Sequence, residues 1–296
     1  MKNVLVPLDG SRLAEHALPL AAVLARRSGG TLTLLHVLET SPPGTVHGQV
    51  HLRHVAEAEG YLQAVADAWR GEGLTVAWHV HETPLSDTAA GVGGHAEEFV
   101  SDLIVMCRHG PARLRDRLVG NLGQQIAGRQ RVPILLVPAR NDPPPPITIR
   151  RCMVPLDGDP AHRRGLAVAA ELARLMRSDL LLATVIDPLH AARKALAVNA
   201  LLPGTTRRIA EFRQASAVEF LQEQTRTLAD RGLPSTAVVI AGGEPARRLA
   251  HLARQRHVDL IALTTHGRAG TRAFWARSLP PRLLRRYHTL FLLVPA

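Results

Sequence analysis

Residues 4–10 read Val-Leu-Val-Pro-Leu-Asp-Gly, and residues 152–158 read Cys-Met-Val-Pro-Leu-Asp-Gly. An apolar run that ends in Pro-Leu-Asp-Gly thus occurs twice, with Asp9 and Asp157 148 positions apart. Two further segments repeat in the same order, as Leu103–Gly110 matches Leu260–Gly267 and Ile134–Ala139 matches Phe291–Ala296. The second half of the chain is therefore a copy of the first. A repeat of about 150 residues is too long for a solenoid and has the size of an independent domain.

The two copies are separated by a proline-rich segment. Residues 141–147 begin Asn-Asp and continue with four prolines, Pro143 to Pro146. Such a run is neither helix nor central strand and favours a stiff, extended linker. We therefore expect a first domain over residues 1–140, a linker over 141–147 and a second domain over 148–296.

Each copy alternates short apolar runs with helical patterns. Continuous apolar strands between helices indicate an α/β fold, with a doubly wound parallel sheet covered on both faces. The first helix is expected to begin at Ser11, to kink at Pro19 and to end at Gly29. Five strands are expected in each copy, over 4–6, 32–37, 74–80, 103–106 and 134–137, and over 152–156, 180–185, 237–240, 260–263 and 290–294.

The second copy carries extra length around residues 188–208. Within it, residues 191–202 form either a short helix or a flap that ends at Pro203 and Gly204, and both interpretations stay open.

Composition narrows the class of protein. Hydrophobic residues make up 46% of the chain, enough for two cores. The formal charge is +11, but the arginines are spread through both halves and aromatic residues are only 3%, so most arginines are expected on solvated surface. Nucleic-acid binding is not expected from this pattern, whereas attraction of small polyanions such as nucleotides is. No apolar run approaches the roughly 18 residues that span a bilayer, and Met1 leads directly into a strand, so a cytoplasmic protein is expected.

Cysteines and histidines give no catalytic or metal-binding pattern. Cys107 and Cys152 occupy non-equivalent places in the copies, so we expect free thiols. His109 and His266 follow the fourth strands and could suggest catalysis, but no His-Asp-Ser or metal-ligand spacing recurs in both copies. Most of the 15 histidines are therefore expected at the surface or in loops, while His109 is expected near the site.

Ligands of an open parallel sheet bind beyond the carboxyl ends of its strands. After the first strand comes Pro7-Leu8-Asp9-Gly10-Ser11, which places a carboxylate in this crevice. A simple capping role for Asp9 and Ser11 is the other interpretation. After the fourth strand, Gly110 and then Gly120-Asn121 open a helix, where backbone amides form a natural phosphate cradle. Two loop glycines that only permit turns would give the same spacing.

Together, the Val-Pro-Leu-Asp-Gly opening, the fourth strand with its His-Gly turn and the Leu-Leu-Val-Pro ending resemble the universal stress protein family in tandem form. The resemblance covers essentially both copies and implies an adenine nucleotide alpha hydrolase-like fold with strand order 3-2-1-4-5 in each. ATP-binding members carry Gly-x2-Gly-x9-Gly-Ser/Thr after the fourth strand. Here the first copy has Cys107-x2-Gly110-x9-Gly120-Asn121, and the second has Thr264-x2-Gly267-x9-Arg277-Ser278.

The resemblance implies ATP or AMP as ligand, with Mg²⁺ accompanying ATP. The first copy is expected to be the better site, because Arg277 replaces a cradle glycine in the second. The implied binding residues are Pro7, Leu8, Asp9, Val37, Met106, Cys107, Gly110, Gly120 and Asn121 in the first copy, and Asp157, Val185, Thr264, Gly267 and Ser278 in the second.

The implied role is nucleotide binding or signalling in a stress response, with at most slow ATP hydrolysis, since no base for water is evident. An ATP-dependent enzyme would need a further catalytic motif. The alternative is a dimerising scaffold whose degenerate sites bind no nucleotide. We also expect the copies to pair within one chain through their last strands, while a homodimer and an unknown protein partner stay open.

Overall fold

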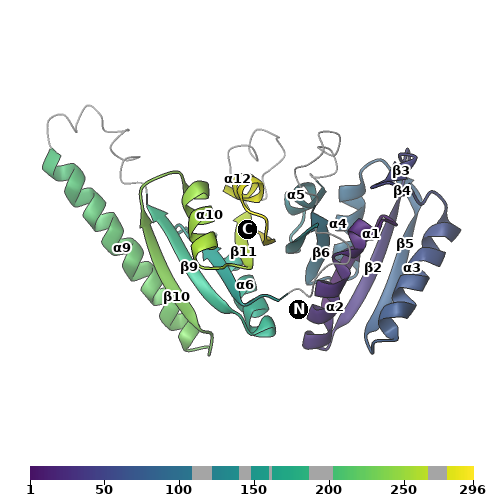
Figure 1. The fold of residues 1–296 in the computed structure, drawn as a ribbon, viewed down its shortest axis with the longest axis horizontal. Helices are drawn as coiled ribbons and strands as arrows, with labels where there is room; N and C mark the ends of the chain where they lie inside the picture. The colour runs from purple at the N-terminus through teal and green to yellow at the C-terminus, as the bar shows by residue number, and fades with distance from the viewer. Residues whose placement is uncertain (109–121, 140–147, 160–161, 187–202, 266–278) are drawn as a thin grey trace. The chain divides into compact units, whose positions relative to one another are not determined.

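A computed structural model describes residues 1–108, 122–139, 148–159, 162–186, 203–265 and 279–296 (Figure 1). The chain divides into two compact units. The first contains Met1–Thr148 and, from the end of the chain, Thr289–Ala296; the second contains Ile149–Leu263 and, among the described residues that follow, 279–288. The expected linker and the segment 191–202 lie outside the described residues.

Ten strands form one mixed, mostly parallel sheet of order β10-β9-β8-β11-β12-β7-β6-β1-β2-β5. Each copy thus has the order 3-2-1-4-5 that the family resemblance implied, and the α/β fold is confirmed. The strands of the first copy are β1 (Asn3–Pro7), β2 (Thr31–Glu39), β5 (Thr75–Leu85), β6 (Leu103–Arg108) and β7 (Ile134–Pro138). Those of the second are β8 (Arg151–Pro155), β9 (Asp179–Ile186), β10 (Ser235–Ala241), β11 (Leu260–Thr265) and β12 (Leu290–Pro295).

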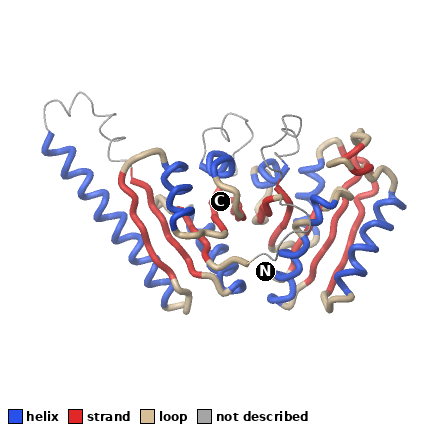
Figure 2. Tube along the Cα trace, viewed as in Figure 1, coloured by secondary structure: helices blue, strands red, loops and turns tan. Residues whose placement is uncertain are grey.

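Helices cover the strands of both units (Figure 2). In the first unit they are α1 (Arg12–Glu15), α2 (Leu18–Ser28), α3 (Val55–Arg70), α4 (Thr88–Glu98) and α5 (Leu122–Ala127). In the second they are α6 (Arg163–Met176), α9 (Pro203–Ala229), α10 (Pro245–Gln255) and α12 (Leu279–Arg286). No helix among the described residues is long and apolar enough to cross a membrane.

The core follows from the apolar runs seen in the sequence. Val4, Leu5 and Val6 of β1 are fully buried, as expected for a parallel strand with helices on both faces. Leu20 and Leu24 of α2 are fully buried as well, one helical turn apart. Burial of these side chains is the main driving force that fixes the helix layer on the sheet.

The first helix differs from its prediction. Ser11 is the N-cap, and its Oγ accepts a hydrogen bond from the Ala14 backbone N–H. The helix ends after one turn, however, and α2 begins separately with Pro19 in its first turn. Proline lacks an N–H and tolerates a helix start better than a helix interior, so it marks a new beginning here and not a kink. Gly29 ends α2 in the left-handed region, at φ 60°.

At one end of the first unit, β12 pairs antiparallel with β7. Phe291 lies opposite Leu136, and Leu292 lies opposite Leu135. All four side chains are buried, so these two last strands are joined through both backbone and apolar contacts.

Candidate functional site

The carboxyl ends of β1, β2 and β6 lie side by side in the first unit. β1 is hydrogen-bonded to β2 on one side and to β6 on the other, all in parallel. Of the expected site residues, Pro7 is the last residue of β1, and Leu8 and Asp9 follow it directly. Val37 of β2 and Cys107 of β6, with its neighbour Met106, come from the flanking strands.

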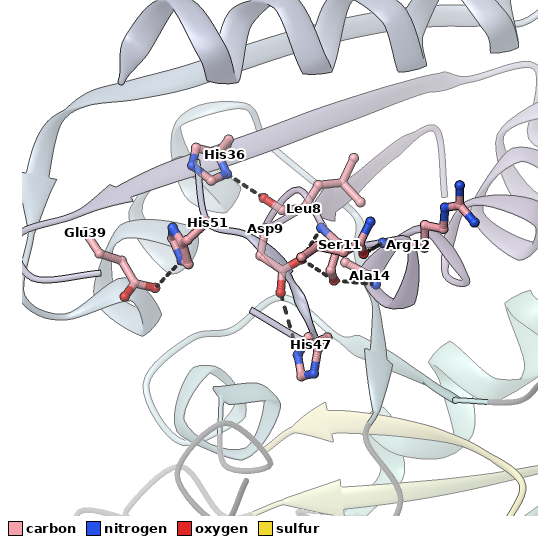
Figure 3. A network of polar contacts seen from close by, with 10 residues as sticks. Leu8, Asp9, Ser11, Arg12, Ala14, His36, Glu39, His47 and His51 are labelled. Carbon is pink, nitrogen blue, oxygen red and sulfur yellow. Dashed lines mark hydrogen bonds and ion pairs between the residues drawn. The ribbon is translucent and has the colours of Figure 1, made fainter. Parts of the chain in front are cut away.

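Asp9 is held in place by Ser11. One carboxylate oxygen, Oδ1, accepts hydrogen bonds from the Ser11 backbone N–H at 2.9 Å and from the Ser11 hydroxyl at 2.6 Å. The same hydroxyl accepts from Ala14 as the helix cap, so the capping interpretation is correct for Ser11. The Asp9 side chain is 32% exposed, and its other oxygen, Oδ2, lies 3.9 Å from His47 Nε2 (Figure 3). Asp9 therefore has one oxygen committed to the loop and one that faces His47.

Cys107 lies close enough to Asp9 to be influenced by its charge. Burial, and secondly the charge of the Asp9 carboxylate, raise the pKa of the Cys107 thiol to about 12. The thiol is therefore neutral at physiological pH, and it acts as a small, mostly buried side chain at the end of β6. This proximity joins the ends of β1 and β6 into one site.

A short hairpin covers the loop that follows β1. It consists of β3 (Thr45–Val46) and β4 (Gln49–Val50), and its turn residues His47 and Gly48 both have positive φ, at 51° and 82°. Gln49 Oε1 accepts a hydrogen bond of 2.7 Å from the Arg12 backbone N–H. This contact ties the hairpin to the start of α1.

The chain after the hairpin also packs against the loop. The Leu52 side chain lies so close to Gly10 that a Cβ at that glycine would be 2.8 Å from Leu52 Cγ, and Gly10 has φ 85°. Only glycine fits this position without strain. With the Asp9–His47 approach, three contacts therefore hold the segment 47–52 over Asp9.

A buried histidine of β2 holds the loop that follows β1 through a hydrogen bond. His36 of β2 is 2% exposed, and its Nδ1 donates a hydrogen bond of 2.7 Å to the Leu8 carbonyl oxygen. His36 Nε2 is buried without a hydrogen-bond partner among the described residues. Burial lowers the pKa of His36, because a charged imidazole would lose its hydration there. Nearby, the buried His51 places its Nε2 4.0 Å from Glu39 Oε1 (Figure 3).

The β2–β5 ladder is irregular where the family resemblance puts the adenine. Val37 pairs with His81, but Glu39 pairs with Leu85, so the register shifts between Val37 and Glu39. Such bulges interrupt the ladder and occur preferentially next to functional sites.

In the second copy, the residues that correspond to Asp9 and Val37 have different surroundings. Asp157 Oδ1 accepts from the Asp159 backbone N–H at 3.1 Å and lies 2.6 Å from His162 Nδ1. The Asp157 side chain is 62% exposed, about twice as exposed as Asp9. Val185 pairs with Ile240 in a ladder that runs without a register shift. Thr264 is half-buried near the end of β11.

The expected phosphate cradles lie outside the described residues. Those residues are Gly110, Gly120 and Asn121 in the first copy and Gly267, Arg277 and Ser278 in the second, together with His109 and His266. Among the residues that are described, no group of three or more His, Cys, Asp or Glu side chains is placed to hold a metal ion. Cys107 and Cys152 are both buried free thiols, as expected.

Sequence reasoning missed four residues around Asp9, namely His36, His47, Gln49 and His51. His36 is an exception to the expectation that most histidines lie at the surface or in loops, because it is buried in β2, whereas His51 is buried but lies in a loop. None of the four belongs to the repeated motifs. One signal was available, because the offset of 148 aligns His36 with Thr184, whose hydroxyl donates to the Leu156 carbonyl at 2.7 Å.

Comparison with known proteins now decides the family. The model of the universal stress protein family matches residues 1–138 and again residues 148–295. The chain belongs to the universal stress protein family. Universal stress protein Sll1654 of Synechocystis sp. is 31% identical over 138 residues, which cover 46% of this chain and 85% of that protein.

Two-domain structures share the complete fold. A universal stress protein from Archaeoglobus fulgidus DSM 4304 has a TM-score of 0.70 at 13% identity, over 99% of this chain and 96% of that one. A functionally unknown protein, PA1789 from Pseudomonas aeruginosa PAO1, has a TM-score of 0.69 at 14% identity, over 100% of this chain and 92% of that one. At such identities the likeness establishes the tandem fold alone.

Adenine nucleotides occur in distant members of the family. One universal stress protein was solved in complex with cAMP (19% identity, 47% of this chain and 98% of that one, TM-score 0.37). Another, from Archaeoglobus fulgidus, was solved in complex with dAMP (20% identity, 47% and 98%, TM-score 0.35). These ligands belong to those two proteins.

Proposed function

We propose that this tandem universal stress protein binds an adenine nucleotide, ATP or AMP, in its first copy. The observation that carries the proposal is that the Asp9 carboxylate is both held in place and partly exposed. Its carboxylate is fixed by two hydrogen bonds from Ser11, stays partly exposed, and lies at the carboxyl ends of β1 and β6. A prepositioned carboxylate in this crevice suits a ribose hydroxyl or an adenine amino group, both of which donate hydrogen bonds.

Other residues of the first copy would complete the site. The bulge at Val37 interrupts the ladder where a backbone contact to adenine is expected. The Cys107 and Met106 side chains would line the wall formed by β6. Gly110, Gly120 and Asn121 remain the expected phosphate cradle on the strength of their family spacing. Mg²⁺ would accompany ATP on its phosphate oxygens, which are the hard ligands that the ion prefers.

The role that fits such a site is binding or signalling in a stress response, and not rapid turnover. The sequence has no P-loop of the Gly-x4-Gly-Lys type and no nucleophile elbow. Neither Cys107, whose thiol is neutral, nor the desolvated His36 is suited to activate water.

Calorimetry and thermal unfolding test the proposal. ATP and AMP should each raise the melting temperature of the full chain, because a ligand that binds only the native state stabilises it. At a ligand concentration 100 times Kd, this linkage gives about 2.7 kcal/mol. Asp9→Asn should weaken binding at least 10-fold, while Asp157→Asn, the same change in the second copy, should leave it within two-fold. The absence of heat and of a melting shift for the unmodified protein in millimolar ATP and AMP would refute nucleotide binding.

A scaffold role is the second candidate. The hairpin that is anchored over Asp9 and the buried ladder between β7 and β12 favour it, because both need no ligand. In that case the two copies form an intramolecular pseudo-two-fold pair, which can associate further with a second chain or with another protein. Sedimentation of the full chain with and without nucleotide separates the two candidates, since only the first predicts a response to ligand.

A further inference from the structure

Two neighbouring helices of the second unit carry arginine without any acidic residue. α10 reads Pro-Ala-Arg-Arg-Leu-Ala-His-Leu-Ala-Arg-Gln, and α12 reads Leu-Pro-Pro-Arg-Leu-Leu-Arg-Arg. The equivalent helices of the first copy, α4 and α5, contain no arginine, and α4 ends in two glutamates. Of the arginines in α10 and α12, only Arg286 aligns with an arginine of the first copy, Arg129 just after α5, so most of this charge belongs to the second copy alone. The basic residues of the pair are Arg247, Arg248, Arg254, Arg282, Arg285 and Arg286, which we call the α10–α12 arginine face.

The fold leaves all six arginines exposed on two helices that pack together. α10 and α12 pack on each other (Figure 1). Their leucines, including Leu249 and Leu283, are buried, whereas all six arginines are exposed. The spread of arginines along the sequence suggested only solvated surface, but packing two short helices side by side concentrates the charge.

Among the described residues, one carboxylate forms ion pairs with arginines of this face. Glu244, the N-cap of α10, lies 3.5 Å from Arg282 Nη1 and 3.5 Å from Arg286 Nη2, and it also accepts from the Arg247 backbone N–H. The charge of one glutamate cannot balance six guanidinium groups. These exposed ion pairs also contribute little stability, about 0–1 kcal/mol each. The α10–α12 arginine face therefore carries a large net positive charge, and its guanidinium groups repel one another unless a polyanion is bound.

We propose that the α10–α12 arginine face binds the phosphodiester backbone of a nucleic-acid duplex without sequence preference. Guanidinium groups recognise phosphate through paired, charge-assisted hydrogen bonds. α10 is about 16 Å long, and the same length of duplex carries about nine phosphate charges. Several arginines can therefore meet phosphates at once.

Other polyanions fit the face less well. Binding to single strands relies on aromatic side chains on which bases stack. Neither helix has one, and the half-buried Tyr287 that follows α12 already lies under the Arg254 guanidinium, 5.9 Å from its ring centre. Insertion into an anionic membrane needs exposed apolar side chains, but the leucines of both helices are buried. A protein interface is usually centred on buried aromatic or apolar anchors, which this face also lacks. Backbone contacts to a duplex require only the arginines.

Fluorescence anisotropy of the full chain with a labelled 20-base-pair DNA or RNA duplex tests the proposal. We expect a Kd near the micromolar range at 100 mM salt and a logarithmic salt slope of about −5 for six contacts. The triple variant Arg247→Gln, Arg248→Gln, Arg285→Gln should weaken binding at least 10-fold and reduce the slope by about 3. The DNA and RNA arms show which duplex is preferred.

A matched variant controls for net charge. Arg213, Arg226 and Arg231 are exposed in the same unit on and just after α9, so changing them to glutamine removes three charges elsewhere. This control should keep the affinity within two-fold. Equal losses in both triple variants, or no binding of either duplex at 50 mM salt, would overturn the proposal. Tighter binding to phosphatidylserine vesicles or to a poly-glutamate peptide than to the duplexes would also overturn it. Equal melting temperatures of the variants verify that both are folded.

Discussion

His36 and Thr184 occupy equivalent positions in the two copies and make the same bond with different side chains. His36 Nδ1 donates to the Leu8 carbonyl, and Thr184 Oγ1 donates to the Leu156 carbonyl, both at 2.7 Å. Each acceptor carbonyl belongs to the residue directly before the aspartate of the repeated Pro-Leu-Asp-Gly motif, Asp9 or Asp157. A side-chain hydrogen bond from the second strand therefore supports the aspartate loop in both copies, but only the first copy uses a group that titrates.

This difference predicts that the free energy of unfolding depends on pH through the protonation of His36. The pKa of His36 lies below the ordinary 6.5. Burial is the main cause, and the nearby His51 also lowers the pKa, whereas the hydrogen bond to Leu8 and the charges of Asp9 and Glu39 act in the opposite direction. Below pH 6.5 the unfolded chain binds a proton at this residue that the folded chain does not. Stability is therefore complete above pH 6.5 and falls as pH drops toward the folded pKa, by at most about 1.4 kcal/mol per pH unit.

The substitution His36→Thr, which copies the second domain, should remove this contribution and keep the hydrogen bond. Urea unfolding at pH 7.5 and 5.5 measures it: the variant should lose less stability between the two values than the unmodified protein. Its stability at pH 7.5 should be lower, because the smaller side chain leaves a cavity. His251→Gln, an exposed histidine of α10, is the control and should keep the full pH dependence. An unchanged pH dependence in His36→Thr would assign the effect to other groups.

At the scale of elements, the sequence predicted the sheet better than it predicted the loops around the site. The strands were recognised because apolar runs such as Val4–Val6 need burial on both faces. The β3–β4 hairpin was missed because its strands have two residues each and its turn is His-Gly, not the Asn-Gly that signals such turns. Asp9 was proposed from its place after the first strand and Val37 from the family resemblance, whereas His36 and Gln49 depend on contacts between segments distant in sequence.

The hairpin provides a prediction at this scale. Gln49→Ala removes the acceptor of the Arg12 backbone N–H, and with it a hydrogen bond that contributes about 1 kcal/mol. Amide hydrogen exchange of residues 45–50, followed by mass spectrometry, should therefore accelerate about 5-fold, while the midpoint of global unfolding stays unchanged. Gln222→Ala on the exposed face of α9 should change neither. Unchanged exchange in Gln49→Ala would show that Leu52 and His47 alone hold the hairpin.

At the scale of the molecule, strand β12 at the end of the chain is part of the second sequence copy, but its contacts place it in the first compact unit. Phe291 is fully buried, lies opposite Leu136 of β7 and has the Arg108 guanidinium 5.4 Å from its ring centre. Phe291→Ala should lower the free energy of unfolding of the first unit by about 3–5 kcal/mol. Hydrogen exchange should then accelerate in β6 and β7.

A core substitution elsewhere distinguishes the two units in this experiment. Leu172 of α6 is fully buried in the second unit, and Leu172→Ala should accelerate exchange in β8 and β9. If Phe291→Ala accelerates exchange only in β8 and β9, the assignment of β12 to the first unit is wrong.

The two copies should also bind nucleotide unequally, with a stoichiometry near one per chain. In the first copy, Asp9 is fixed by Ser11, and the ladder is interrupted at Val37. In the second, Asp157 is paired with His162, the ladder at Val185 is regular, and the cradle glycine of the motif has become Arg277. A calorimetric titration with ATP should give about one site, Gly120→Arg should abolish it, and Asp157→Asn should not change it. Two sites of equal affinity would contradict this asymmetry and would mean that His162 releases Asp157 when the ligand binds.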